Sequence, residues 1–194
     1  MVYRNSDQPL IPLKLKLVIA GGFGAGKTTL VGAVSEIPPL STEERITEAS
    51  SAADGLVGVE RKCTTTVALD FGRITLHDRS LVLLLFGAPG QDRLWFMWSD
   101  LTEGAVGAVV IVDTRRLLDS FAAVEYFERC QLPFVVAVNE FDGGFHYEPH
   151  EVRDALALKP DVPVMLCNAR DTLSARGVLI QLVRHALRRS RRSL

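Results

Sequence analysis

Short apolar runs alternate along this chain with segments of helical character. Six runs rich in Val, Ile and Leu predict β-strands at 14–20, 65–75, 81–86, 105–112, 133–138 and 162–166. Five segments between and after them predict helices near 27–36, 92–99, 115–130, 149–157 and 173–190. Most of the runs are continuously apolar, as is typical of parallel strands covered on both faces. The pattern therefore predicts an α/β fold with an open, doubly wound sheet.

Two segments depart from this regular alternation. The runs 65–75 and 81–86 are joined by the short polar turn His77-Asp78-Arg79-Ser80, which predicts a hairpin and hence one antiparallel strand. Residues 38–62 receive no single assignment: residues 41–45 could cap a short helix, and so long a connection in a compact domain is usually functional or mobile. We expect a flexible N-terminus at 1–12, one domain at 13–190 and a basic tail end at 191–194.

Composition narrows the class of protein. The 194 residues carry a net charge of −1, with 47% hydrophobic and 23% charged residues, which is ordinary for a globular α/β domain and gives no overall attraction to nucleic acid. Cys63, Cys130 and Cys167 are widely spaced and indicate neither a disulfide framework nor a zinc site. No apolar run is long enough to span a bilayer. We expect a cytoplasmic protein that partners recruit to the membrane, and the basic C-terminal helix leaves a weak peripheral contact open.

The strongest chemical signal follows the first predicted strand. The run GGFGAGKT from Gly21 matches the phosphate-loop pattern G-x-x-x-x-G-K-[ST] and lies between a strand and a helix. Its glycines let successive N–H groups point at an anion, and the helix N-terminus adds partial positive charge. Lys27 would supply charge to the β and γ phosphates, and the Thr28 hydroxyl is placed to ligate Mg²⁺. The sequence thus predicts a nucleoside triphosphate site at Gly21, Gly22, Phe23, Gly24, Ala25, Gly26, Lys27, Thr28 and Thr29.

Four later segments lie at the ends of predicted strands, where a nucleotide held by this loop would be reached. They are CTTTVALDF at 63–71, FGAPGQDR at 86–93, NEFD at 139–142 and CNAR at 167–170. In this order the segments resemble the Ras-like small GTPases across nearly the whole chain. Their departures are similar to a bacterial branch that includes the gliding-motility GTPases (MglA-like) and the actinobacterial conservon GTPases (CvnD-type).

The resemblance assigns two switch segments. In the first, Thr66 would ligate Mg²⁺ and sense the γ-phosphate, with Thr65 as the alternative, although adjacent threonines also favour a strand without any ligand. In the second, Gly90 would offer its N–H to the γ-phosphate and Gln91 would be the catalytic residue that orients the attacking water. Gly87 stands where the family has the aspartate that holds Mg²⁺ through a water.

The last two segments resemble base-recognition motifs. Asp142 could accept hydrogen bonds from guanine N1–H and the exocyclic amine, a donor pair that adenine lacks, so it indicates GTP rather than ATP. The resemblance also implies that Asn139 binds the nucleotide, that the Ala169 N–H contacts guanine O6 and that Arg170 stacks on the base. Glu140 replaces the lysine that braces the phosphate loop in that family, which should weaken the brace.

Together these residues predict a switch that binds GTP or GDP with Mg²⁺, hydrolyses GTP slowly without a partner, and signals through nucleotide-dependent partner binding. The bacterial branch implies a roadblock/LC7-type regulatory protein and a sensor-kinase complex as partners. Two alternatives remain open. A pseudo-GTPase with little turnover would account for Phe23, Gly87 and Glu140, whereas a phosphate-loop kinase would leave the NEFD segment without a purpose. A further hypothesis is that Arg61 or Lys62 supplies positive charge in cis, with Arg61 acting as an arginine finger.

Overall fold

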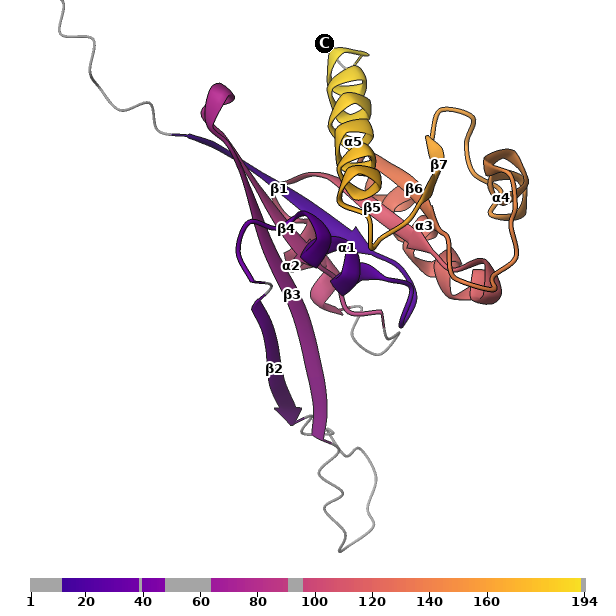
Figure 1. Cartoon of the computed structure of the whole chain (residues 1–194), viewed down its shortest axis with the longest axis horizontal. Coiled ribbons are helices and arrows are strands. Elements are labelled where there is room, and N and C mark those ends of the chain that lie inside the picture. Colours follow the sequence, from indigo (N-terminus) through magenta and orange to yellow (C-terminus); the bar gives the residue numbers. More distant parts are fainter. Residues whose placement is uncertain (1–11, 39, 48–63, 91–95, 193–194) are drawn as a thin grey trace, which may run out of the picture.

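The computed structural model describes residues 12–38, 40–47, 64–90 and 96–192. In this part of the chain, one mixed sheet has the strand order β2-β3-β4-β1-β5-β6-β7 (Figure 1). The six predicted strands are all present. They are β1 (Leu13–Ala20), β3 (Thr64–Leu76), β4 (Leu81–Gly87), β5 (Ala105–Val112), β6 (Phe134–Asn139) and β7 (Val164–Cys167).

The hairpin predicted around His77–Arg79 is also present, because β3 pairs antiparallel with β4 from Leu76↔Leu81 to Asp70↔Gly87. The pairs β1–β4, β1–β5, β5–β6 and β6–β7 are parallel. The carboxyl ends of β1, β4, β5, β6 and β7 therefore share one edge of the sheet, and the loops that follow them carry most of the predicted site residues, with Thr66 in β3 as an exception.

A seventh strand, β2 (Leu40–Thr47), lies in the segment that received no single assignment from the sequence, so residues 41–45 belong to a strand and do not cap a helix. It pairs antiparallel with β3 from Leu40↔Phe71 to Thr47↔Thr64, and the two strands extend together from the body of the domain (Figure 1). Since β2 runs against β3, and β3 runs against β4, β3 remains the one antiparallel strand among those described. The sequence of β2, LSTEERIT, has no apolar run because an edge strand need not be buried on both faces.

In the described part of the chain, five α-helices cover the two faces of the sheet. They are α1 (Lys27–Val34), α2 (Phe96–Thr102), α3 (Phe121–Cys130), α4 (Pro149–Ala155) and α5 (Thr172–Arg192), and the short 3-10 segment η3 (Thr114–Ser120) precedes α3. Side chains of β1 alternate between the faces: Leu17 and Ile19 pack with α1 and α5, and Val18 and Ala20 pack with α2 and α3. The predicted doubly wound α/β fold is confirmed. None of the described helices combines the length and apolar character needed to cross a membrane.

Candidate functional site

The loop between β1 and α1 adopts backbone conformations that require glycine. Gly26, which caps α1, has φ +111°, and Gly21 has φ +140°. A Cβ on Gly21 would also lie 2.2 Å from the carbonyl oxygen of Ile111 in β5. These two positions turn the chain sharply between strand and helix, so that Lys27 and Thr28 begin α1 beside the loop.

The Lys27 ammonium lies inside this loop. Its Nζ donates to the carbonyl oxygens of Gly21 at 2.9 Å and Gly22 at 2.7 Å. Burial lowers the pKa of Lys27 to about 8; the Asp70 carboxylate opposes this shift and the Arg116 guanidinium adds to it. The ammonium is therefore still mainly protonated at neutral pH, and its charge is concentrated where the predicted phosphates would lie.

Thr28 contacts a carboxylate that the sequence analysis did not assign. Its Oγ1 donates to Oδ2 of Asp70 at 2.5 Å, and Asp70 is only 7% exposed. Asp70 lies in β3 directly opposite Gly87 in β4. A Cβ on Gly87 would lie 2.9 Å from the Cβ of Asp70 and 3.1 Å from its Oδ2. The carboxylate of Asp70 thus occupies the space next to Thr28 that a side chain at position 87 would use.

Hydroxyl and carboxylate oxygens are the hard ligands that Mg²⁺ prefers, so Thr28 and Asp70 fit a magnesium site at the phosphate loop. The sequence held a usable signal for Asp70. Because the turn at 77–80 pairs Leu76 with Leu81, counting back along the hairpin places residue 70 opposite residue 87.

The segment after β4 closes against the phosphate loop. A Cβ on Gly90 would lie 2.6 Å from Lys27 Nζ and 2.8 Å from the Gly21 carbonyl oxygen, so this close approach requires glycine. The Ala88 N–H donates to the Ile19 carbonyl, and the Trp98 indole N–H of α2 donates to the Pro89 carbonyl at 3.2 Å. The structure thus brings Gly90 to the predicted phosphate position.

The threonines predicted to belong to the first switch lie in the β2–β3 ladder. Thr66 pairs with Arg45, and Thr65 pairs with Ile46. Thr66 is four residues from Asp70 along β3, or about 13 Å of extended strand. The role of Thr66 in binding Mg²⁺ stays a prediction. For Thr66 to reach a metal beside Asp70, the end of the β2–β3 ladder that carries Thr66 would have to rearrange. Gln91, Arg61 and Lys62 lie outside the described residues.

Asn139 joins three loops at the carboxyl edge of the sheet. Its side chain is buried, with 6% of the residue exposed. The Nδ2 group donates to the Ala25 carbonyl at 2.9 Å, and Oδ1 accepts from the Ala169 N–H at 3.0 Å. The phosphate loop, the NEFD segment and the CNAR segment are therefore adjacent. The Ala169 N–H, predicted to contact guanine O6, donates to Asn139 in this arrangement, and its contact with a base stays a prediction.

Asp142 and Arg170 form an exposed ion pair beside this junction. Arg170 donates to Oδ2 of Asp142 at 2.8 Å, with 90% of the Asp142 side chain and 68% of the Arg170 side chain exposed. Such a pair contributes only about 0–1 kcal/mol, so either side chain can exchange it for another partner. Nearby, the Arg115 guanidinium stacks 3.8 Å from the ring centroid of Phe141, which helps to position this loop.

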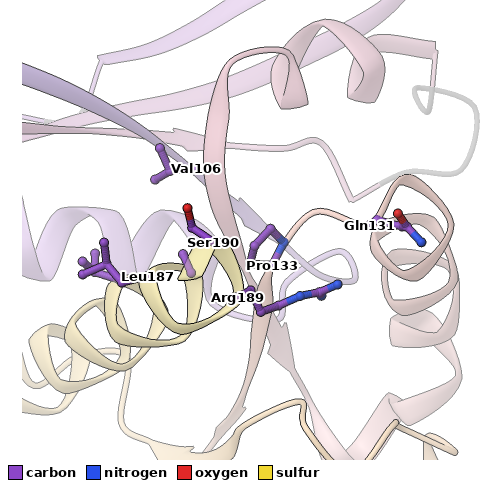
Figure 2. Close-up of a pocket in the computed structure, with 8 residues that line it drawn as sticks. Val106, Gln131, Pro133, Leu187, Arg189 and Ser190 are labelled. Atoms are coloured by element: carbon purple, nitrogen blue, oxygen red, sulfur yellow. The ribbon is translucent and has the colours of Figure 1, made fainter. Parts of the chain in front are cut away.

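A separate cavity of about 420 Å³ lies at the other end of the sheet. Figure 2 shows residues of α5 and of the chain before β6 that line it, among them Leu187, Arg189 and Pro133. Val106 near the start of β5 also lines it, whereas the predicted site residues follow the carboxyl ends of the strands. This cavity is therefore not part of the candidate site.

Comparisons with known proteins agree with this geometry. Residues 19–189 match a family described as conserved hypothetical ATP binding protein. The chain is 26% identical to the Ras-related protein Rab-7b of Bos taurus over 193 residues, which cover 94% of this chain and 87% of that protein.

Two solved structures show the same arrangement of elements. One is the Arl6 BBS3 small GTPase of Trypanosoma brucei with bound nucleotide analogue GppNp, with a TM-score of 0.62 and 16% identity over 90% of this chain and 98% of that chain. The other is the G domain of the T. maritima FeoB iron transporter, with a TM-score of 0.60 and 17% identity over 89% of this chain and 99% of that chain. At these identities the likeness shows the fold alone, and it confirms the predicted Ras-like arrangement of a phosphate-loop domain.

Proposed function

The chain belongs to the family described as conserved hypothetical ATP binding protein, and we propose that this member of the family is a GTP-binding molecular switch. The phosphates would lie on the loop of Lys27, and the base would lie against the NEFD and CNAR segments. Hydrolysis of GTP to GDP would then change the arrangement of the switch segments and hence the choice of partner.

The main support for this proposal is the position of Asn139. Its buried carboxamide joins the phosphate loop to the loop of Ala169, while Asp142 stands exposed three residues further along the same segment. A carboxylate accepts hydrogen bonds from both guanine N1–H and the guanine amine, whereas adenine offers no such pair. Asp142 therefore supports guanine as the base, although the family description names ATP.

Competition between GTP and ATP for the purified protein tests this choice. We expect GTP and GDP to displace a fluorescent guanine nucleotide with at least about 100-fold higher affinity than ATP, since a site built to receive hydrogen bonds strongly rejects a ligand that lacks the donors. Equal affinities would contradict the guanine assignment and leave a phosphate-binding loop that does not select the base.

Magnesium is the next part of the proposal. We place Mg²⁺ beside Thr28 and Asp70, with Asp70 serving in place of the aspartate that Gly87 replaces. A metal there would shield the charge of the β and γ phosphates. The buried hydrogen bond between Thr28 and Asp70 supports this placement, and Thr66 remains the further ligand predicted from the sequence.

Replacing Asp70 by asparagine should weaken GTP binding by about 10- to 100-fold in the presence of Mg²⁺, because a charged ligand and a charge-assisted hydrogen bond are lost. The affinity for GDP measured in excess chelator should change little. Titrations of GTP with and without Mg²⁺ check this. Asp78→Asn, at the exposed hairpin turn, is the matched control. If the GTP affinity of the Asp70 variant depends on Mg²⁺ as strongly as that of wild type, Asp70 is not a ligand of the metal.

In this proposal, Gln91 orients the water that attacks the γ-phosphate of GTP. Replacing Gln91 by leucine should slow single-turnover hydrolysis by at least about 10-fold without weakening GTP binding, because a misplaced nucleophile commonly reduces the rate by up to about 10²-fold. Quench-flow measurement of released phosphate checks this. An unchanged rate would deny Gln91 the role. No hydrolysis by the wild type under any condition, with or without partners, would instead favour the pseudo-GTPase.

The bacterial branch and its partners complete the proposal. Gly87 and the resemblance of the switch segments support a gliding-motility or conservon type of GTPase. That assignment implies a roadblock/LC7-type regulatory protein and a sensor-kinase complex as partners. It also implies a cytoplasmic location, from which those partners would recruit the protein to the membrane.

A further inference from the structure

An arginine that belongs to none of the nucleotide-binding segments reaches the phosphate loop. Arg116 lies in η3, the connection between β5 and α3. Its backbone has φ −141° and ψ 53°, so the segment is kinked at this residue. Asp113 begins the segment by accepting a hydrogen bond from the Arg115 N–H. Since β5 neighbours β1, the segment that follows β5 lies beside the loop that follows β1.

The contact with the loop is direct. The Arg116 guanidinium donates to the carbonyl oxygen of Phe23 at 2.7 Å. A Cβ on Gly24 would lie 3.1 Å from the same guanidinium nitrogen, and a Cβ on Gly22 would lie 2.6 Å from the Cβ of Asp119. Residues of η3 therefore pack against the phosphate loop from Gly22 to Gly24.

Two carboxylates hold the guanidinium in this place. Its nitrogen atoms lie 3.5 Å from Oδ2 of Asp113 and 4.0 Å from Oδ2 of Asp119. Asp113 is buried and already receives two hydrogen bonds from the Arg115 side chain, each 2.8 Å long. The Arg116 side chain remains 46% exposed. It is thus oriented by its hydrogen bonds to the Phe23 carbonyl and to Asp113, and it remains accessible to a ligand.

Arg116 and Lys27 place two cations on one short loop. Lys27 donates to the backbone carbonyl oxygens of Gly21 and Gly22, and Arg116 donates to that of the next residue, Phe23. A polyphosphate bound at this loop would attract both groups. The Glu140 carboxylate lies 4.0 Å from Nδ1 of His146, and its predicted weakening of the hold on the loop stays a prediction.

We propose that Arg116 is a positioning residue for the phosphate loop and a second cation for the bound polyphosphate. Its hydrogen bond to the Phe23 carbonyl holds the loop so that the backbone N–H groups converge, and its charge adds to that of Lys27. The inference rests on the phosphate-binding part of the proposed function and is independent of the choice of base and of hydrolysis.

The test compares Arg116→Ala and Arg116→Lys with wild type in binding GTP, GDP and ATP by calorimetry at several salt concentrations. We expect Arg116→Ala to weaken binding of the preferred triphosphate by about 10- to 100-fold, since a charge-assisted contact is lost. The salt dependence of the affinity should also become shallower, because one cation fewer faces the phosphates. Arg116→Lys should restore the salt dependence, because it keeps the charge, and only part of the affinity, because it lacks the planar guanidinium.

Arg188→Ala, which removes an exposed arginine of α5, controls for net charge and should bind like wild type. Thermal unfolding of each variant checks that the fold is kept. Wild-type affinity and salt dependence in Arg116→Ala would overturn the inference while leaving the proposed function intact. Preference of the wild type for ATP would contradict only the choice of base, and the effect of the Arg116 substitutions would then be measured on ATP affinity. Failure of the wild type to bind any of these nucleotides would overturn both.

Discussion

Replacing Lys27 by alanine is expected to lower the affinity for nucleoside triphosphate by about 10²- to 10³-fold. The Lys27 ammonium lies within the loop at 2.7 Å and 2.9 Å from two backbone carbonyl oxygens, and nothing else on α1 could bring an equivalent charge to the β and γ phosphates. Truncating one partner of a buried, hydrogen-bonded charge pair weakens binding by about 2–5 kcal/mol, and each 1.4 kcal/mol is tenfold in affinity.

Calorimetric titration of GTP into both proteins measures this effect. Lys14→Ala is a matched control, because Lys14 is exposed at the opposite end of β1 from the loop. Circular dichroism should show that the Lys27 variant remains folded, so that weak binding reflects the site. Unchanged affinity in that variant would refute the assignment of residues 21–28 as a phosphate loop and, with it, every role proposed for the neighbouring side chains.

The fold was predictable from the sequence to the extent that burial leaves a pattern. The strands β1, β4, β5 and β6 read as apolar runs because the sheet buries them on both faces. The strand β2 left no such pattern, since LSTEERIT has Leu40 and Ile46 as its only apolar residues. A strand of this kind is specified by its backbone pairing with β3, and hydrophobic periodicity carries no information about that pairing.

The candidate site was also predictable only in part: residues close together in the sequence could be identified, and contacts between distant segments could not. The phosphate loop could be located because contiguous residues form it, and Asn139 because it ends a buried strand. Asp70 was missed because its importance comes from its pairing with Gly87 across two strands. Arg116 was missed because its partner, the Phe23 carbonyl, lies 93 residues away in the sequence. Contacts between separate loops depend on strand order, which local motifs do not report.

Replacing Asp142 by asparagine is expected to weaken GTP binding by about 10²-fold and to make xanthine nucleotides the better ligands. The Asp142 carboxylate can accept from both guanine donors, and hydrogen bonds to a charged group contribute about 1.5–3 kcal/mol each. An asparagine carboxamide would direct its own N–H₂ donors at the guanine amine. Xanthine has a carbonyl oxygen in place of that amine, so the same carboxamide could donate to it while accepting from N1–H.

Parallel titrations of GTP and xanthosine triphosphate into wild type and variant measure the exchange of preference. Asp154→Asn, on the exposed face of α4, should leave both affinities unchanged. Because Asp142 pairs with Arg170 in the structure, Arg170→Ala separates the two possible causes of any loss. If Asp142 selects the base directly, Arg170→Ala will still prefer GTP over xanthosine triphosphate. If Arg170→Ala instead loses that preference, the ion pair and not the carboxylate alone determines the specificity.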